Sequence, residues 1–182
     1  MSTRIKINVL SEKSIRDAVA DIERYKTEFI EKNREFLRKL VEAGIEVVHN
    51  NLSAYQYSTD GTGDGDSIPP TAKRPYVRMG VNDGIMIATL TLQGKDVMFV
   101  EFGAGVHFNG GVAVGSPNPK GVELGYTIGS YGMGQGKYDH WYYERNGEEH
   151  ISYGTRAMMP MYQADMKIRT KFVDIAKKVF GG

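Results

Sequence analysis

The stretch Asp96-Val-Met-Phe-Val-Glu-Phe-Gly-Ala-Gly, residues 96–105, joins a short apolar run to two closely spaced glycines. The β-branched and aromatic residues of Val97–Phe102 are typical of a strand on a half-buried, pleated surface. Gly103 and Gly105 follow, and glycine adopts backbone angles that other residues avoid. We therefore expect a strand over 97–102 that ends in a sharp change of chain direction.

Two more strands are expected before this one, over Tyr76–Val81 and Ile85–Leu92. The links 82–84 and 93–95 contain glycine and are short enough for tight hairpins, so the three runs predict an antiparallel meander. The second strand alternates, and its better core face contains Met86, Ala88, Leu90 and Leu92. A further short strand is expected over 4–9, where Ile5, Ile7 and Val9 alternate.

The N-terminal region predicts a long helix, capped by Ser11 or Ser14 and ending near Asn50. Its first half carries a narrow apolar stripe of coiled-coil type, made of Ile15, Ala18, Ile22, Tyr25 and Phe29. About 40 helical residues would span roughly 60 Å, whereas a compact globule of this chain length is roughly 40 Å across. The helix must therefore bend, break near Asn33 or Gly44, or project, and a projecting stripe needs another chain to cover it.

A second helix is expected at the C-terminal end, beginning at Pro160, which suits a first helical turn. Apolar residues at steps of three and four form its core face: Met161, Ala164, Ile168, Phe172, Ile175 and Val179. Gly181 and Gly182 are expected to end it. The fold class that follows is α+β: a small antiparallel sheet packed with a long N-terminal helix and a C-terminal helix, all within a single domain over 1–182.

Two segments are expected to be loops. Residues 58–74 are small and polar, and their aspartates lack the ligand spacing of an EF-hand. Residues 103–150 form a long insertion rich in glycine and aromatic residues. Aromatic residues are enriched at protein interfaces, so we predict an assembly interface that contains Tyr131, Tyr138, Trp141, Tyr142 and Tyr143. The alternative, stacking on nucleic acid bases, is opposed by the acidic residues Asp139 and Glu144 nearby.

Composition excludes several kinds of site. The 23 basic and 22 acidic residues give a net charge of +1, which creates no general attraction to nucleic acid or to an anionic membrane. The chain contains no cysteine, so disulfides and thiolate metal sites are excluded. Its four histidines lack metal-binding spacing. No cofactor, metal, signal peptide or membrane-spanning segment is expected.

No catalytic motif is complete. The glycines of 132–136 precede Lys137, but the spacing of a phosphate-binding loop is absent. Glu101 is expected to serve structure, bonded to backbone at a turn or to Arg156. The alternative is a small hydrolase or nucleotide-dependent enzyme that uses Glu101 as a base together with the glycine-rich loop.

The order of motifs resembles one family. A strand ending in Phe-Gly-Ala-Gly, a long insertion and then Gly154-Thr-Arg-Ala-Met-Met-Pro160 before a helix is similar to tail-completion or head–tail joining (neck, tail-terminator-like) proteins of long-tailed bacteriophages and prophages. The residues that carry the resemblance are Glu101, Gly103, Gly105, Gly154, Arg156 and Pro160. The family usually has Thr where this chain has Ala104, so any role of that hydroxyl is absent.

The resemblance implies a structural virion protein and no enzymatic activity. Such proteins form a ring, commonly a hexamer, between the portal complex and the tail tube. The implied partners are further copies of the chain, portal or head-completion (connector) proteins, and the tail tube or tail terminator protein. The implied location is the neck of the virion, after assembly in the host bacterial cytoplasm. No membrane or sequence-specific nucleic acid partner is implied, although DNA passes through such a ring.

Overall fold

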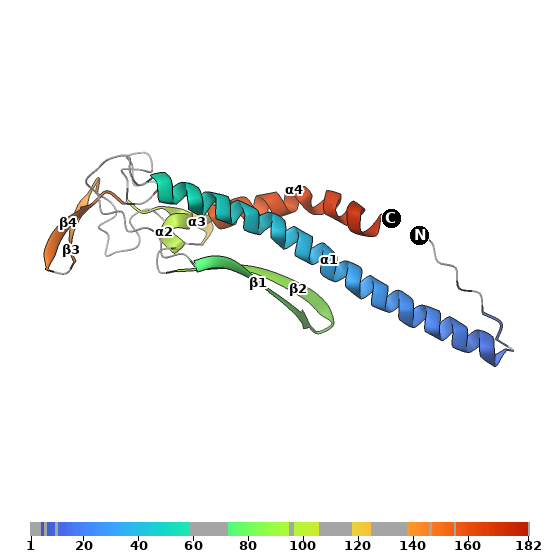
Figure 1. The fold of residues 1–182 in the computed structure, drawn as a ribbon. Helices are drawn as coiled ribbons and strands as arrows, with labels where there is room; N and C mark the ends of the chain where they lie inside the picture. The colour runs from blue at the N-terminus through green and yellow to red at the C-terminus, as the bar shows by residue number, and fades with distance from the viewer. Residues whose placement is uncertain are drawn as a thin grey trace.

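The computed structural model describes residues 5, 7–9, 11–58, 73–94, 97–105, 118–124, 138–145, 147–154 and 156–181. The fold is α+β, with a long N-terminal helix, a C-terminal helix and small antiparallel sheets, and Figure 1 shows that the molecule is elongated. Its elements are α1 (Glu12–Ser58), β1 (Lys73–Asn82), β2 (Ile85–Gln93), α2 (Val97–Phe102), α3 (Pro119–Glu123), β3 (Trp141–Arg145), β4 (Glu148–Ser152) and α4 (Pro160–Phe180).

Helix α1 is continuous over 47 residues, which corresponds to about 70 Å. Ser11 caps it, because the Ser14 N–H donates to the Ser11 hydroxyl at 3.3 Å. The helix passes through both Asn33 and Gly44, so the expectation of a break is wrong and the expectation of a projecting helix is confirmed. Its N-terminal part, before Phe29, extends beyond the end of α4 (Figure 1).

Helix α4 begins at Pro160, as expected, and runs antiparallel beside the C-terminal half of α1 (Figure 1). The expected core face is confirmed at Ala164 and Val179, which are buried. Phe172 was expected on the same core face, but it is 48% exposed. Its ring still meets the Phe36 ring edge to face, with centroids 5.2 Å apart, at the margin of the seam between the two helices.

Gly44 lies where α1, α4 and β2 meet. A Cβ atom at this position would lie 2.8 Å from Ile168 Cδ1 and 3.1 Å from Leu90 Cδ2. The glycine is therefore no weak point of the helix. It permits the close approach of a helix and a strand on two sides of α1.

Strands β1 and β2 form an antiparallel hairpin with Asn82 opposite Ile85. Asp83 and Gly84 connect them with positive φ values of 48° and 78°, as a tight primed turn requires. Met86, Ala88 and Leu90 are partly buried and face α1, whereas the alternate positions of β2 up to Thr89 are exposed. The predicted core face of this strand is confirmed.

The prediction of a third strand in the meander is wrong. Residues 97–102 form helix α2, and each sheet has two strands in the part of the chain that is described. Val100, Glu101 and Phe102 are all buried. A strand with one face on the core would bury alternate residues, whereas one turn of helix in a crowded site buries consecutive ones.

Three further expectations need correction or lie partly outside the described residues. Within 103–150 the structure contains α3 and the β3–β4 hairpin, so this segment is no continuous loop. Ile5, Ile7 and Asn8 are not in a strand; instead the Asn8 N–H donates to the Ser14 hydroxyl at 2.9 Å. Ser58 ends α1 and Lys73 begins β1, and 59–72 lie outside the described residues.

Among the helices described, none is both long and apolar enough to span a membrane.

We expect Gly44→Ala to destabilise the fold although alanine favours a helix by about 1 kcal/mol. The added methyl would overlap Ile168 Cδ1, and overpacking costs about 1–3 kcal/mol. Ile168→Val removes that Cδ1 atom, so the double variant Gly44→Ala/Ile168→Val should lose less stability than the two single changes added together. Urea unfolding of all four proteins measures this coupling, and strict additivity would contradict the proposed contact.

Candidate assembly surface and the clasp that positions it

Glu101 holds the N-terminus of α4. Its side chain is only 6% exposed. One carboxylate oxygen, Oε2, accepts the Met161 N–H at 2.8 Å, and Oε1 accepts the Tyr162 N–H at 2.9 Å and the Asn118 Nδ2 at 2.8 Å. We call Glu101, Asn118 and the first turn of α4 the clasp.

The clasp replaces an ordinary helix cap. Met159 stands at the N-cap position with a left-handed backbone and no capping side chain. Pro160 has no N–H, and the Gln163 N–H donates to the Met159 carbonyl oxygen at 2.9 Å. The two remaining N–H groups of the first turn, those of Met161 and Tyr162, are the ones a capping side chain would satisfy, and Glu101 takes that role from sixty residues earlier.

Asn118 connects the clasp to α3. It is buried, and its Oδ1 accepts the Lys120 N–H at 2.9 Å. Burial raises the pKa of the Glu101 carboxyl above its ordinary value of 4.5, although the three hydrogen bonds that it accepts act in the opposite direction.

The prediction that Arg156 is a partner of Glu101 is wrong. Arg156 is exposed, and neutral N–H groups surround the carboxylate instead.

The two segments that carry the family resemblance, 101–105 and 154–160, meet beside the clasp. Gly103, Gly105 and Gly154 all have positive φ, and Gly103 ends α2 with its N–H bonded to the Phe99 carbonyl at 2.7 Å. A Cβ atom on Gly154 would lie 2.1 Å from the carbonyl oxygen of Ala104, and one on Gly105 would lie 3.0 Å from the Trp141 ring. These glycines therefore permit two backbone segments to cross in contact.

The aromatic residues predicted as an interface are only partly brought together. Trp141 is half-buried against Gly105, so it belongs to the crossing. Tyr138 and Tyr142 are exposed, and the Tyr142 ring contacts His140 with centroids 5.7 Å apart. Tyr143 lies in β3, while Tyr131 lies outside the described residues.

A longer exposed apolar surface lies on the N-terminal half of α1. We call it the stripe; its members are 43–55% exposed and comprise Ile15, Val19, Ile22, Tyr25 and Phe29. The Phe29 ring lies 6.4 Å from the Phe180 ring, near the end of α4. The stripe thus continues the α1–α4 seam past the point where α4 ends. The coiled-coil spacing predicted four of the expected members, but Ala18 is buried.

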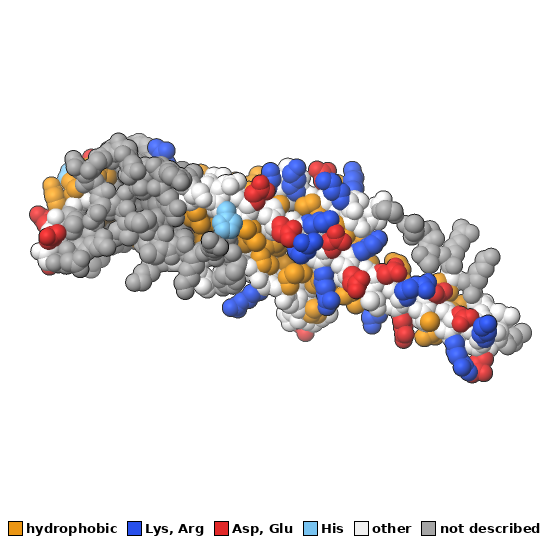
Figure 2. Space-filling view, in the orientation of Figure 1, with side chains coloured by type: hydrophobic (Ala, Val, Ile, Leu, Met, Phe, Trp, Pro, Cys, Tyr) orange, Lys and Arg blue, Asp and Glu red, His pale blue; other side chains and the backbone are white. Residues whose placement is uncertain are grey.

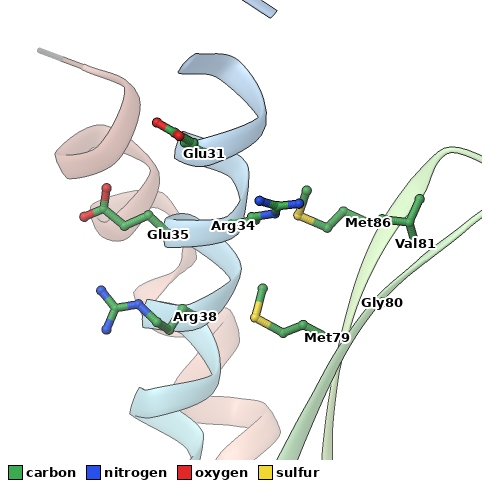
Figure 3. A pocket seen from close by; sticks show the side chains of 8 residues that line it. All are labelled: Glu31, Arg34, Glu35, Arg38, Met79, Gly80, Val81 and Met86. Atoms are coloured by element: carbon green, nitrogen blue, oxygen red, sulfur yellow. The ribbon is translucent and has the colours of Figure 1, made fainter. Parts of the chain in front are cut away.

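A cleft separates the tip of the β1–β2 hairpin from α1. The hairpin wall consists of Met79, Gly80, Val81 and Met86, and the α1 wall consists of Glu31, Arg34, Glu35 and Arg38. Its volume is about 520 Å³. Figure 3 shows both methionines extending toward α1 and Arg34 extending toward them. In Figure 2, hydrophobic side chains gather among charged ones over this middle part of the molecule.

Sequence reasoning did not find this cleft. The signal was available in the pairing: Met79 lies opposite Ala88 and Val81 opposite Met86, so all share the face of Leu90. That face packs on α1 at Leu90 but remains open at the tip, where Met79 and Val81 are 44% and 66% exposed. An apolar face that loses its cover in this way is a candidate binding surface.

The described residues contain no group of three or more His, Cys, Asp or Glu side chains placed to hold a metal ion. Comparisons with protein-family models, with curated proteins and with solved structures find no match to this chain. The apolar surfaces of α1 and the hairpin, and the clasp that fixes the start of α4, are the features on which a functional argument rests.

We expect Gly154→Ala to be far more destabilising than Gly147→Ala. Both glycines have positive φ, 88° and 83°, so either alanine costs about 1–2 kcal/mol in backbone strain. At Gly147 the added methyl meets open space, whereas at Gly154 it meets the Ala104 carbonyl. Thermal unfolding should separate the two variants by at least about 1–3 kcal/mol; equal losses would mean that strain alone constrains Gly154.

Glu101→Gln should destabilise the protein by about 1–3 kcal/mol, because an amide has one oxygen for three N–H donors and its NH₂ must face one of them. The exposed Glu46→Gln on α1 is the matched control and should change little. Chemical unfolding measures both. Equal stability of Glu101→Gln and the wild-type protein would show that the carboxylate is not the cap of α4.

Proposed function

We propose that this chain is a structural protein of the neck of a long-tailed bacteriophage or prophage, where copies form a ring that joins the portal or connector complex to the tail tube. The observation that carries the proposal is the stripe on the N-terminal part of α1, which projects beyond α4. A single copy leaves five large apolar side chains of one helix face about half exposed over some four turns. A surface of that kind is typical of a subunit that is completed by a neighbour.

The geometry of the motif gives second support. Five of the six residues that carry the family resemblance, Glu101, Gly103, Gly105, Gly154 and Pro160, lie around one junction, the start of α4, whereas the sixth, Arg156, is exposed. Each of the five has a structural reason to be that residue type: a cap, a positive φ or a missing N–H. At Ala104 the backbone carbonyl makes the close approach to Gly154, so the contact does not need the threonine hydroxyl of the family pattern.

The enzymatic alternative receives less support. A general base needs a free oxygen near its substrate, yet both Glu101 oxygens already accept N–H groups of the protein's own fold. The glycine-rich residues 132–136 lie outside the described part of the chain, and no observation on the described residues adds to that alternative.

The joining role predicts a defined phenotype. Deleting the gene in the phage or prophage that carries it should leave DNA-filled heads and separate tails, because neither partner alone would supply the connecting ring. Electron microscopy of induced lysates measures this, and an antibody to the protein should label the head–tail junction of complete particles. Expression of the wild-type gene in trans is the control. Complete, infectious particles from the deletion strain would contradict the proposal.

A further inference from the structure

Charge is divided unevenly among the elements of the molecule. Helix α1 is nearly balanced, with eight basic and nine acidic residues. Helix α4 has five basic and two acidic residues, whereas residues 138–153, which contain β3 and β4, have one basic and four acidic residues. The β3–β4 hairpin lies at one end of the elongated shape, and α4 leads away from it (Figure 1). The molecule thus has an acidic hairpin and a basic helix that extend in different directions.

The acidic surface lies on one face of the β3–β4 hairpin. Glu144 and Glu149 are directly opposite each other across the two strands, and both are exposed. Like charges in this arrangement destabilise a hairpin, and neither carboxylate is in an ion pair among the described residues. Tyr142 lies on the same face, two residues before Glu144, and is 57% exposed. Glu148 is opposite Arg145 on the other face. We call Tyr142, Glu144 and Glu149 the acidic tip.

The outer face of α4 combines apolar and positively charged side chains. The buried residues Ala164 and Val179 mark the face that packs inward. On the opposite side, steps of four, three and four residues align the row that we call the basic row: Met166, Thr170, Val173 and Lys177. Met166 and Val173 are 48% and 56% exposed, and Lys177 is also exposed. The row therefore offers an apolar surface with a cation one turn further along.

The positive charge in and beside the basic row is not neutralised within the molecule. Asp165 is paired with Arg169 at 2.8 Å, so Asp174 is the acidic residue of α4 that remains to offset the lysines. The exposed lysines of α4 are in no ion pair among the described residues, and they are Lys167, Lys171, Lys177 and Lys178. A partner that covers the basic row is therefore expected to be acidic.

The acidic tip and the basic row match in spacing. Tyr142 and Glu144 are two residues apart on a strand, which separates them by about 7 Å. Val173 and Lys177 are four residues apart on a helix, which separates them by about 6 Å along its axis. Tyr142 can therefore pack on Val173 while the two carboxylates of the tip face Lys177. The aromatic ring supplies contact area, and the charges set the orientation, because exposed ion pairs alone contribute little.

This contact cannot form within one copy. Helix α4 begins at Pro160, eight residues after Ser152 at the end of β4, and Lys177 lies about 26 Å further along the helix. The hairpin and α4 extend away from the clasp in different directions (Figure 1). The acidic tip that meets the basic row must therefore belong to another copy.

From these observations we infer that the acidic tip of one copy binds the basic row of the next copy, in a head-to-tail contact. The inference rests on the self-association within the proposed function and specifies a contact other than the stripe. It also accounts for the opposed pair of Glu144 and Glu149, whose repulsion is relieved when a neighbour supplies Lys177. Because the contact joins two different patches, repetition closes into a ring if the rotation between copies permits, and otherwise continues as a filament.

Glu149→Lys separates a role in assembly from a role in folding. The substitution places opposite charges across the two strands, so the urea midpoint of the monomer should stay the same or rise. Its self-association, measured by sedimentation equilibrium at low salt, should nevertheless fall about tenfold, because the tip then presents a cation to Lys177. Lower stability with unchanged association would overturn the inference.

Reversing the whole tip tests the charges without changing their arrangement. Glu144→Lys/Glu149→Lys keeps a like-charge pair across the strands, and circular dichroism verifies the fold. Its association should be weakened about tenfold or more at about 0.05 M salt, with a smaller difference at about 0.5 M, where salt screens the charges. Glu23→Lys/Glu46→Lys is the matched control, since it changes the net charge equally at exposed positions of α1, and it should associate like the wild-type protein. An equal loss in the control would overturn the inference.

Charge exchange gives the sharpest result. Adding Lys177→Glu to the reversed tip restores opposite charges between neighbouring copies, so this triple variant should regain association that the reversed tip lost. Adding Lys32→Glu instead, at an exposed position of α1, is the matched control and should restore nothing. Equal recovery in both triple variants, or recovery in neither, would overturn the contact.

The remaining outcomes separate the contact from the function. Association that is unaffected by the reversed tip would overturn the contact but leave the joining role intact. Wild-type protein that stays monomeric at every concentration would overturn the contact as well, and the deletion phenotype would then decide the joining role independently.

Discussion

The carboxylate of Glu101 is the interaction on which the rest of the structure depends. The N-cap residue of α4, Met159, has no side chain that can accept hydrogen bonds. Glu101 of α2 supplies the missing acceptors instead. The same carboxylate binds Asn118, which in turn orients the start of α3. A negative charge at a helix N-terminus is also favoured by the helix dipole. One buried group thus fixes where α4 begins, and the direct contacts of α4 with Phe36 and Gly44 place the rest of the helix along α1.

The sequence predicted the elements whose signals are periodic. The spacing of apolar residues predicted α1, α4 and the inner face of β2, and Pro160 marked the start of α4. The run Val97–Phe102 misled because six residues, apolar at every position except Glu101, are too few to separate a strand from a helix by period. Its β-branched and aromatic residues favour a strand locally, but the tertiary demand for Glu101 at the start of α4 prevailed.

The candidate surfaces were predicted less well than the fold, and the β3–β4 hairpin and the cleft were missed in different ways. The β3–β4 hairpin had a local signal, since Asn146-Gly147 separates two short runs in the manner of a two-residue turn. The shared apolar face of the cleft wall follows from the hairpin pairing, but whether that face is covered has no local signal. Whether the apolar face of a hairpin is covered depends on where the hairpin leaves the helix that it packs on, and that is decided by contacts such as Gly44 with Leu90, 46 residues apart in the chain.

The continuous α1 has a mechanical consequence. From Phe29, which contacts the last residue of α4, to Glu12 the helix extends about 25 Å as an unbroken rod. A tilt of about 10° at Phe29 would therefore move the far end by about 4 Å, since displacement grows with length along the rod. Small changes of packing where α4 ends therefore become larger displacements at the N-terminal end of α1. A chain built in this way converts a local rearrangement beside α4 into a change of reach on the scale of a whole side chain.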